Sequence, residues 1–212
     1  MTGPDDLVTL DRLAVQEAVR LLDLARDDDW ERDTPCAGWT LRGLAAHMSA
    51  QHHGFAAAAR GEGGDLARWR EPVTATDPAA EHRAAASGLI AAFAEPGVLD
   101  RGFGLPELRP GPGPGGGWPG RFAVGFHLVD YVVHAWDVAV TLGARVEVPE
   151  PVVTAALAVA RRVPTDPESR GPGSAFAPPV EKAAYASDLD LMLALLGRDP
   201  GHGGAAEPQM QL

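Results

Sequence analysis

The stretch FHLVDYVVHAWD, residues 126–137, carries the pattern that decides both the fold and the candidate site. Its apolar residues recur every three or four positions, which predicts a helix. Asp130 and His134 stand four residues apart, so a helix places their side chains on one face, one turn apart. Such a pair can hold one divalent metal ion through an oxygen and a nitrogen ligand. The alternative is a hydrogen bond on the helix surface.

His47 is the candidate for a third metal ligand. It lies in the middle of another predicted helix, among apolar neighbours such as Leu44 and Met48. Two helices would then supply three protein ligands, which leaves coordination positions open for water or substrate, as in catalytic sites. The alternative is a core histidine whose hydrogen bonds are satisfied within the protein.

His127 and Asp137 flank the metal pair on the same predicted helix. His127 precedes His134 by seven residues, so the two lie on nearly the same face. It could be a fourth ligand, a residue that contacts a ligand, or a structural residue, and the last two interpretations are preferred. Asp137 follows His134 by three residues and could orient its ring as an outer carboxylate. A hydrogen bond from Asp137 to a helix N-terminus or an arginine is the alternative.

The remaining histidines receive less weight. His52 lies about 140° around the helix from His47, and both His52 and His53 are predicted to be solvated. His82 and His202 have no supporting context in the sequence.

Cys36 is the single cysteine of the chain, so no internal disulfide and no cysteine metal cluster can form. It precedes the helix of His47, where the helix dipole could make it a reactive thiol. A small packed residue is the preferred interpretation.

The rest of the chain predicts an all-α protein. Apolar residues recur at helical spacing in six segments, and the four longest of these suffice for a bundle. The Gly/Pro-rich segment 102–120 is predicted to be a surface loop, with an active-site lid as the alternative. The predicted helices cover residues 5–28, 40–60, 78–94, 121–142, 150–162 and 180–196.

Composition and charge exclude several classes of function. The formal charge of −11 disfavours binding to nucleic acid, and an apolar fraction of 45% is enough for a core. The N-terminus has no signal-peptide pattern and no apolar run reaches membrane-spanning length, so the cytoplasm is the expected location. We expect one domain over residues 1–200 and a disordered tail over residues 201–212.

Three stretches together resemble a known family. WERDTPCAGWTLRGLAAH (30–47) and DYVVHAWDVAVTLG (130–143) are similar to two signatures of the mycothiol-dependent maleylpyruvate isomerase N-terminal family, within the DinB-like superfamily. FAPPV (176–180) and LALLGRDP (193–200) resemble the end of an actinobacterial metal-binding branch of that family. The resemblance covers residues from about Leu7 to Pro200.

The resemblance implies a DinB-like four-helix bundle with extra short helices and one divalent metal ion. The ligand positions of the family match His47, Asp130 and His134, although the isomerases carry glutamate at the position of Asp130. Zinc is the expected metal, with nickel, iron and manganese as alternatives.

The resemblance also implies an activity, namely isomerisation or S-transfer with mycothiol or a similar small thiol. His127 or Asp137 would move protons in that reaction. The expected partners are a small-molecule substrate and, because DinB-like bundles often pair, a second copy of the chain. The alternatives are a thiol-independent metalloenzyme, such as a hydrolase or an isomerase or cyclase of secondary metabolism, and a non-catalytic bundle that binds a metal or a small molecule.

Overall fold

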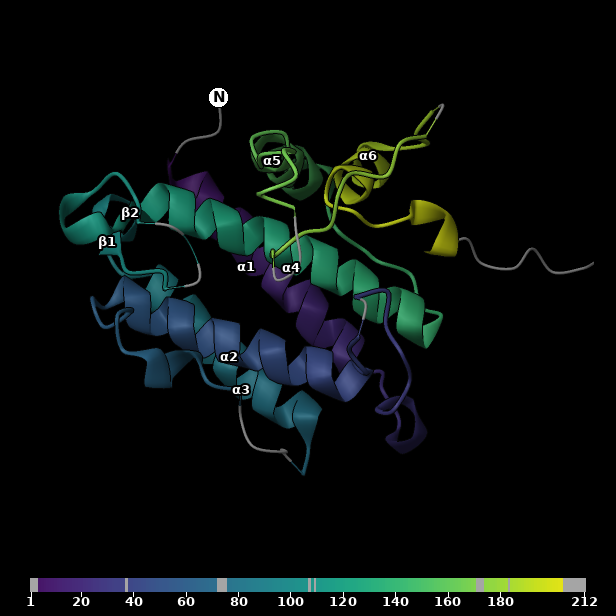
Figure 1. Ribbon diagram of the computed structural model, residues 1–212. Coiled ribbons are helices and arrows are strands. Elements are labelled where there is room, and N and C mark those ends of the chain that lie inside the picture. Colours follow the sequence, from purple (N-terminus) through teal and green to yellow (C-terminus); the bar gives the residue numbers. More distant parts are fainter. Residues whose placement is uncertain are drawn as a thin grey trace, which may run out of the picture.

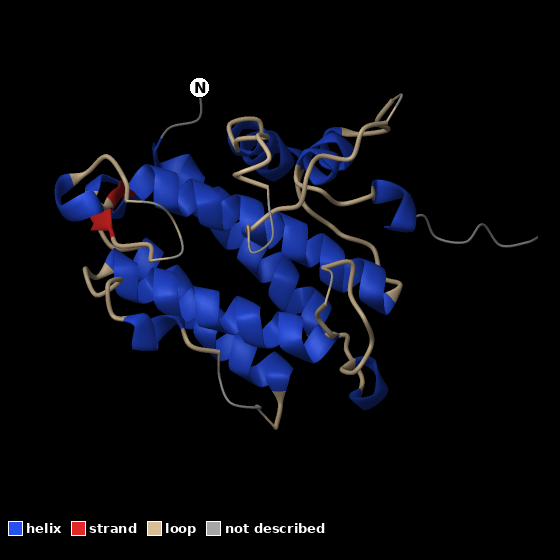
Figure 2. Cartoon of the chain, in the orientation of Figure 1, coloured by secondary structure: helices blue, strands red, loops and turns tan. Residues whose placement is uncertain are grey.

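Helices dominate the architecture of the protein, in agreement with the predicted all-α class (Figures 1 and 2). The computed structural model describes residues 4–36, 38–71, 76–106, 108, 110–170, 174–182 and 184–203. The α-helices are α1 (Pro4–Leu22), α2 (Leu41–Ala59), α3 (Pro78–Phe93), α4 (Gly120–Leu142), α5 (Glu150–Ala160) and α6 (Asp188–Leu195). Short 3-10 helices are η1 (Asp27–Asp29), η2 (Leu66–Trp69), η3 (Val98–Asp100), η4 (Pro114–Gly116) and η5 (Pro200–Gly203).

The four bundle helices pack as two pairs. α1 packs chiefly on α4, and α2 packs chiefly on α3, while α5 packs on α4 and α1, and α6 packs on α5 (Figure 1). α2 and α4 have fewer contacts with each other than with their own partners. The two helices that carry the predicted ligands therefore belong to different halves of the bundle.

Local signals at the ends of α2 and α4 explain why these helices begin and end where they do. Thr40 caps α2, and its side-chain oxygen accepts a hydrogen bond from the Gly43 amide at 3.3 Å. Gly143 ends α4 with a φ of 65°, a left-handed conformation that glycine adopts without steric cost. Both boundaries agree with the predicted ones.

The bundle core is built from aliphatic and alanine side chains of all four helices. Fully buried examples are Val15 and Leu21 on α1, Leu44 on α2, Leu89 on α3 and Leu128 on α4. The alanines let the helix backbones approach closely, and the larger side chains fill the remaining space. This hydrophobic burial supplies most of the driving force for folding.

Two predicted helices were too long. α1 ends at Leu22, and residues 27–29 form the separate turn η1, because three aspartates are unfavourable at the C-terminus of a helix and favourable at an N-terminus. α6 begins only at Asp188, where the Ser187 side chain accepts a hydrogen bond from the Asp190 amide at 3.1 Å. Described residues of 180–187 are irregular instead of helical.

The Gly/Pro-rich segment contains structure that the sequence did not predict. β1 (Gly102–Phe103) pairs antiparallel with β2 (Trp118–Pro119), with Phe103 opposite Trp118. The Trp118 ring packs on Phe126 at the start of α4, with ring centroids 5.2 Å apart. Part of the predicted surface loop is therefore a small hairpin held against the bundle.

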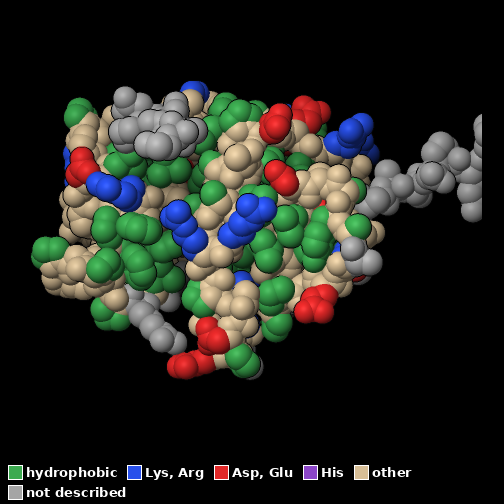
Figure 3. Space-filling model, turned by 90° about the horizontal axis from the view of Figure 1, so that it is seen from above, with side chains coloured by type: hydrophobic (Ala, Val, Ile, Leu, Met, Phe, Trp, Pro, Cys, Tyr) green, Lys and Arg blue, Asp and Glu red, His purple; other side chains and the backbone are tan. Residues whose placement is uncertain are grey.

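The end of the chain is described only in part. Residues 201–203 belong to η5, and residues 204–212 lie outside the described part of the chain. Among the described helices, none is long and apolar enough to cross a membrane. The face seen from above in Figure 3 mixes hydrophobic, basic and acidic side chains.

Candidate metal centre

The three predicted metal ligands lie together in the middle of the bundle. His47 comes from α2, whereas Asp130 and His134 come from α4, and one ligand atom from each lies within 4.8 Å of the others. His134 Nε2 is 3.4 Å from Asp130 Oδ1, and the rings of His47 and His134 have centroids 5.7 Å apart. We call these three residues the metal layer. Their donor atoms are close enough to share a single ion.

The metal layer opens to solvent on one side. The side chains of His47 and Asp130 are 23% and 25% exposed, whereas that of His134 is 6% exposed. Burial lowers the pKa of His47 to about 4, with Asp130 opposing this shift and His134 adding to it. The His47 ring is therefore neutral at physiological pH, which is the form that binds a metal.

Asp137 satisfies both of the roles considered for it. His134 Nδ1 donates a hydrogen bond to Asp137 Oδ2 at 3.0 Å, and Arg198 donates to both carboxylate oxygens at 2.8 and 2.9 Å. Burial alone would raise the pKa of Asp137, but the bonds from His134 and Arg198 outweigh it and lower that pKa. A carboxylate can only accept, so His134 Nδ1 carries the proton and Nε2 faces the metal layer.

Arg198 is the residue of the site that reasoning from helix spacing did not identify. It follows α6, is buried, and lies 61 residues along the chain from Asp137. A lone arginine near the C-terminus has no periodic pattern that could have marked it. In the sequence, Arg198 stood out only as part of the stretch 193–200, which resembles the C-terminal end of one branch of the family.

The loop before α2 brings the Trp39 ring to the metal layer. The Thr34 amide donates to the Trp39 carbonyl at 3.0 Å, and the Thr34 hydroxyl donates to the carbonyls of Cys36 and Trp39. The Trp39 ring then packs edge-on against His47, with centroids 4.3 Å apart. The loop thus covers one side of the His47 ring.

Cys36 shows none of the activation expected for a reactive thiol. Burial raises its pKa to about 11, and the nearby Arg198 only partly opposes this. Its sulfur lies within 4.8 Å of donor atoms of His134 and Asp137, which forms a second geometric group. Since the Asp137 carboxylate in that group is already bound by Arg198, the metal layer is the better ion site.

A second polar cluster fills the bundle interior closer to the start of α4. It takes one side chain from each bundle helix: Asp11 from α1, His52 from α2, His82 from α3 and His127 from α4. We call it the histidine layer. All four side chains are buried. The prediction that His52 is solvated was therefore wrong, because α2 is buried on more than one side, and the side that carries His52 also faces the bundle interior.

A chain of hydrogen bonds joins three members of the histidine layer. His127 Nδ1 is 2.7 Å from Asp11 Oδ1, and His127 Nε2 is 3.3 Å from His52 Nδ1. His82 stacks near His52 with ring centroids 4.8 Å apart. Among described residues, no partner is present for His52 Nε2 or for either ring nitrogen of His82. His127 is thus enclosed by hydrogen-bonding partners of the histidine layer and lies two helical turns from His134.

Of the remaining histidines, His53 lies outside both layers. His53 is exposed on α2 and its Nε2 is 3.3 Å from Glu81 Oε1, in agreement with the predicted solvation. The His202 side chain lies outside the described part of the chain. Glu71, an exposed residue after η2, has its Oε1 3.9 Å from His47 Nδ1 at the open side of the metal layer.

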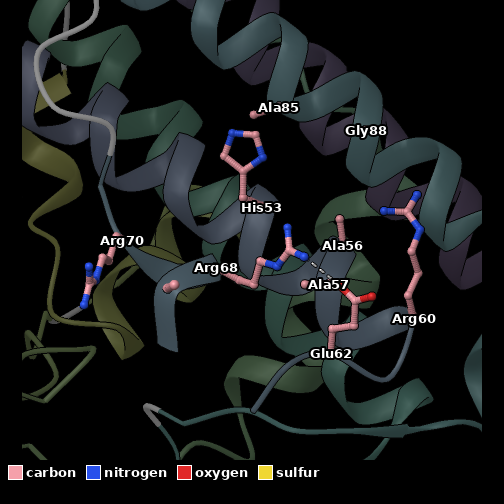
Figure 4. Close-up of a pocket in the computed structure, with 10 residues that line it drawn as sticks. His53, Ala56, Ala57, Arg60, Glu62, Arg68, Arg70, Ala85 and Gly88 are labelled. Carbon is pink, nitrogen blue, oxygen red and sulfur yellow. Dashed lines mark hydrogen bonds and ion pairs between the residues drawn. The ribbon is translucent and has the colours of Figure 1, made fainter. Parts of the chain in front are cut away.

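A surface cavity of about 300 Å³ lies on the outer side of α2 and α3 and shares no lining residue with the metal layer (Figure 4). Its walls include Arg60, Arg68 and the exposed His53. Arg68 donates to Glu62 at 3.1 Å, and Arg60 donates to Glu95 at 3.4 Å. The guanidinium groups of Arg60 and Arg68 are thus already paired with carboxylates.

The helical bundle defines a DinB-like fold. Two solved structures share it, a mycothiol-dependent maleylpyruvate isomerase and a histidine-to-alanine mutant of that enzyme, with TM-scores of 0.53 and 0.57. Each is 18% identical to this chain, and the match covers 76% of this chain and 70% of the other. At this identity the likeness concerns the fold alone.

The chain belongs to the mycothiol maleylpyruvate isomerase N-terminal domain family, whose profile matches residues 12–139. The matched segment contains the whole metal layer and ends before α5. Two relatives come from Mycobacterium tuberculosis: "Uncharacterized protein Rv0738" of strain ATCC 25618 / H37Rv and "Uncharacterized protein MT0763" of strain CDC 1551 / Oshkosh. Each is 31% identical over 183 residues, which cover 84% of this chain and 90% of the relative.

Proposed function

We propose that the protein is a metal-dependent enzyme that uses mycothiol or a similar small thiol to isomerise, or transfer sulfur to, a small electrophilic substrate. The observation that carries the proposal is the convergence of His47, Asp130 and His134 at a partly open position. The family description, which names mycothiol, supplies the class of co-substrate. Zinc is the expected ion, with nickel, iron and manganese as alternatives.

The donor set fits a catalytic metal ion. Two imidazoles and one carboxylate are ligands that zinc and its neighbours accept, and three protein ligands leave a position for an exogenous group. Asp137 holds the His134 ring with Nε2 toward the site, as outer carboxylates do for metal-bound histidines. Arg198 compensates the charge of Asp137 and fixes its position.

A divalent cation at this position would stabilise the thiolate form of a bound thiol, which is mostly protonated when free at neutral pH. For isomerisation, the thiolate sulfur adds to one carbon of an activated double bond, and the electron pair moves onto the conjugated carbonyl. Rotation about the new single bond follows. The electron pair then returns and expels the thiolate, so the thiol is regenerated and no oxidant is needed.

The residues beside the ligands have separate roles in this proposal. Asp137 acts through His134. Instead of the predicted proton transfer, we assign it the role of holding the proton on His134 Nδ1. His127 is buried in the histidine layer, so we assign it a structural role and not contact with substrate. The exposed carboxylate of Glu71 lies 3.9 Å from His47 Nδ1 and could accept a proton from an incoming thiol.

The first test is elemental analysis of tag-free protein beside a His47→Ala/His134→Ala double variant. The proposal requires close to one metal ion per chain in the wild type and a loss of that ion in the variant. Wild-type protein that takes up no zinc, nickel, iron or manganese after reloading would contradict the metal site. The three residues would then be interpreted as bundle packing.

The second test separates the thiol-dependent activity from the alternatives. Metal-loaded protein is mixed with maleylpyruvate, the substrate in the name of the structural relatives, with mycothiol and without it. Turnover only with the thiol supports the proposal. Turnover of any substrate without a thiol favours a thiol-independent metalloenzyme, and metal binding without turnover in a wider electrophile panel favours a non-catalytic binding protein.

A further inference from the structure

The proposed metal layer takes ligands from both halves of the bundle, which contact each other less than the two helices within each pair do. His47 belongs to the α2–α3 pair, whereas Asp130 and His134 belong to the α1–α4 pair. Ligands on one helix keep their spacing automatically, but ligands on two helices depend on how those helices are held together. The distance from His47 to the other two ligands therefore needs a separate structural device.

Tyr131 makes the contacts that such a device requires. Its hydroxyl donates a hydrogen bond to the Met48 carbonyl, which crosses from α4 to α2. Its ring is fully buried and stacks on His52 and on His127, each with ring centroids 4.2 Å apart. One side chain is thus fixed by a directional bond and by aromatic contact with both helices.

The two residues joined by the hydrogen bond are direct sequence neighbours of proposed metal ligands. Tyr131 is the residue directly after Asp130, and Met48 is the residue directly after His47. The hydrogen bond between them therefore joins the backbone of α2 and the side chain of α4 one residue away from a ligand on each helix. The histidine layer, through the His52 and His127 rings, braces the tyrosine from both helices.

We propose that Tyr131 is a positioning residue of the metal layer, which sets the distance between His47 and the Asp130–His134 pair. This inference rests on the metal site of the proposed function, but it does not depend on any catalytic activity. Tyr131 touches neither substrate nor ion in this role. It acts by holding α2 against α4 before an ion binds, so that little rearrangement is required on binding.

The test compares Tyr131→Phe with Tyr185→Phe. Tyr131→Phe keeps the buried ring and its stacking and removes only the hydroxyl, and the Met48 carbonyl keeps its partner within the helix. Tyr185 is the other tyrosine of the chain, and its hydroxyl likewise donates to a backbone carbonyl, that of Val180 at 3.1 Å. Because Val180 and Tyr185 lie outside the bundle helices, this variant is a matched control.

Two readouts are measured on each protein. Chelator competition gives the zinc affinity, which we expect to fall about 10-fold in Tyr131→Phe, the lower end of what outer groups contribute, and to stay unchanged in Tyr185→Phe. Nuclear Overhauser contacts between the His47 and His134 rings, recorded without metal, should weaken in Tyr131→Phe only, because the two rings start 5.7 Å apart.

The outcomes distinguish the two proposals. Unchanged zinc affinity and unchanged ring contacts in Tyr131→Phe would overturn the positioning role, even if thermal stability fell. If the wild type bound no metal, the proposed function would fail, and the ring contacts of the metal-free proteins would still decide whether Tyr131 sets the distance between the helices.

Discussion

The metal layer and the histidine layer contain the same kinds of side chain but differ in what surrounds them. Each combines histidines with one carboxylate, and each draws on both halves of the bundle. The metal layer is partly open, with His47 and Asp130 about a quarter exposed, and its donors converge. The histidine layer is closed, and its ring nitrogens bond to Asp11 or to one another, or have no partner among the described residues.

This difference shows that residue type alone does not define a site. A histidine becomes a useful ligand where its ring is neutral, oriented by an outer carboxylate and reachable from solvent. The same ring sealed among helices becomes a polar core residue that fixes how those helices meet, at a cost in desolvation. The following predictions test whether the two layers can be separated by mutation.

His134→Ala should have the largest effect, and it should be confined to metal binding. Loss of one of three ligands is expected to weaken zinc affinity on the order of 1000-fold. The protein should stay folded, because Asp137 keeps its two bonds to Arg198. Chelator competition and circular dichroism measure the two properties. A variant that unfolds would show that His134 is a core residue and not primarily a ligand.

His127→Ala should show the opposite behaviour. Removing the ring leaves the buried Asp11 carboxyl without its partner, which should lower the free energy of unfolding by about 3 kcal/mol. The folded fraction should still bind one metal ion per chain. Urea denaturation and elemental analysis test both points, with the exposed His53→Ala as the control. Loss of metal at unchanged stability would place His127 in the metal site instead.

His82→Leu should change how stability depends on pH. Burial lowers the pKa of His82 from its ordinary 6.5 to about 3, and nearby His127 adds to this, so between these values the unfolded chain takes up a proton that the folded protein does not. His82 therefore destabilises the fold progressively as the pH falls through this window, by up to about 1.4 kcal/mol per pH unit. The variant should lose that slope.

The control for His82→Leu is His53→Leu, which replaces an exposed histidine on the neighbouring helix. Urea denaturation at several pH values between 4 and 7, chosen within the window set by the two pKa values, gives the slope for each protein. Equal slopes in wild type and His82→Leu would mean that His82 takes up its proton without unfolding the bundle.

Cys36→Ser should have the smallest effect. The raised pKa of about 11 keeps the thiol protonated at neutral pH, so Cys36 should contribute neither a thiolate ligand nor a nucleophile. Zinc stoichiometry and turnover should match the wild type, and alkylation of the wild-type thiol at neutral pH should be slow. A loss of zinc in Cys36→Ser would move the ion toward the group that Cys36 forms with His134 and Asp137.

Local patterns predicted much of what was found. Helical spacing predicted α2 and α4 nearly to their ends, because caps such as Thr40 and stops such as Gly143 act through bonds within a few residues. The same spacing overestimated α1 and α6, since the choice between one more helical turn and an irregular segment depends on packing. The hairpin of β1 and β2 was missed because each strand has only two residues.

The sequence by itself determined the helical class and the pairing of Asp130 with His134, because a helix brings residues four apart together whatever its surroundings. It also supplied His47 as the partner through its apolar setting and its place in a family signature. Only the tertiary structure decided that Arg198 holds Asp137, that Tyr131 reaches Met48, and that His52 is buried and not solvated. These contacts join residues far apart in the chain, and they exist only once the two halves of the bundle have packed.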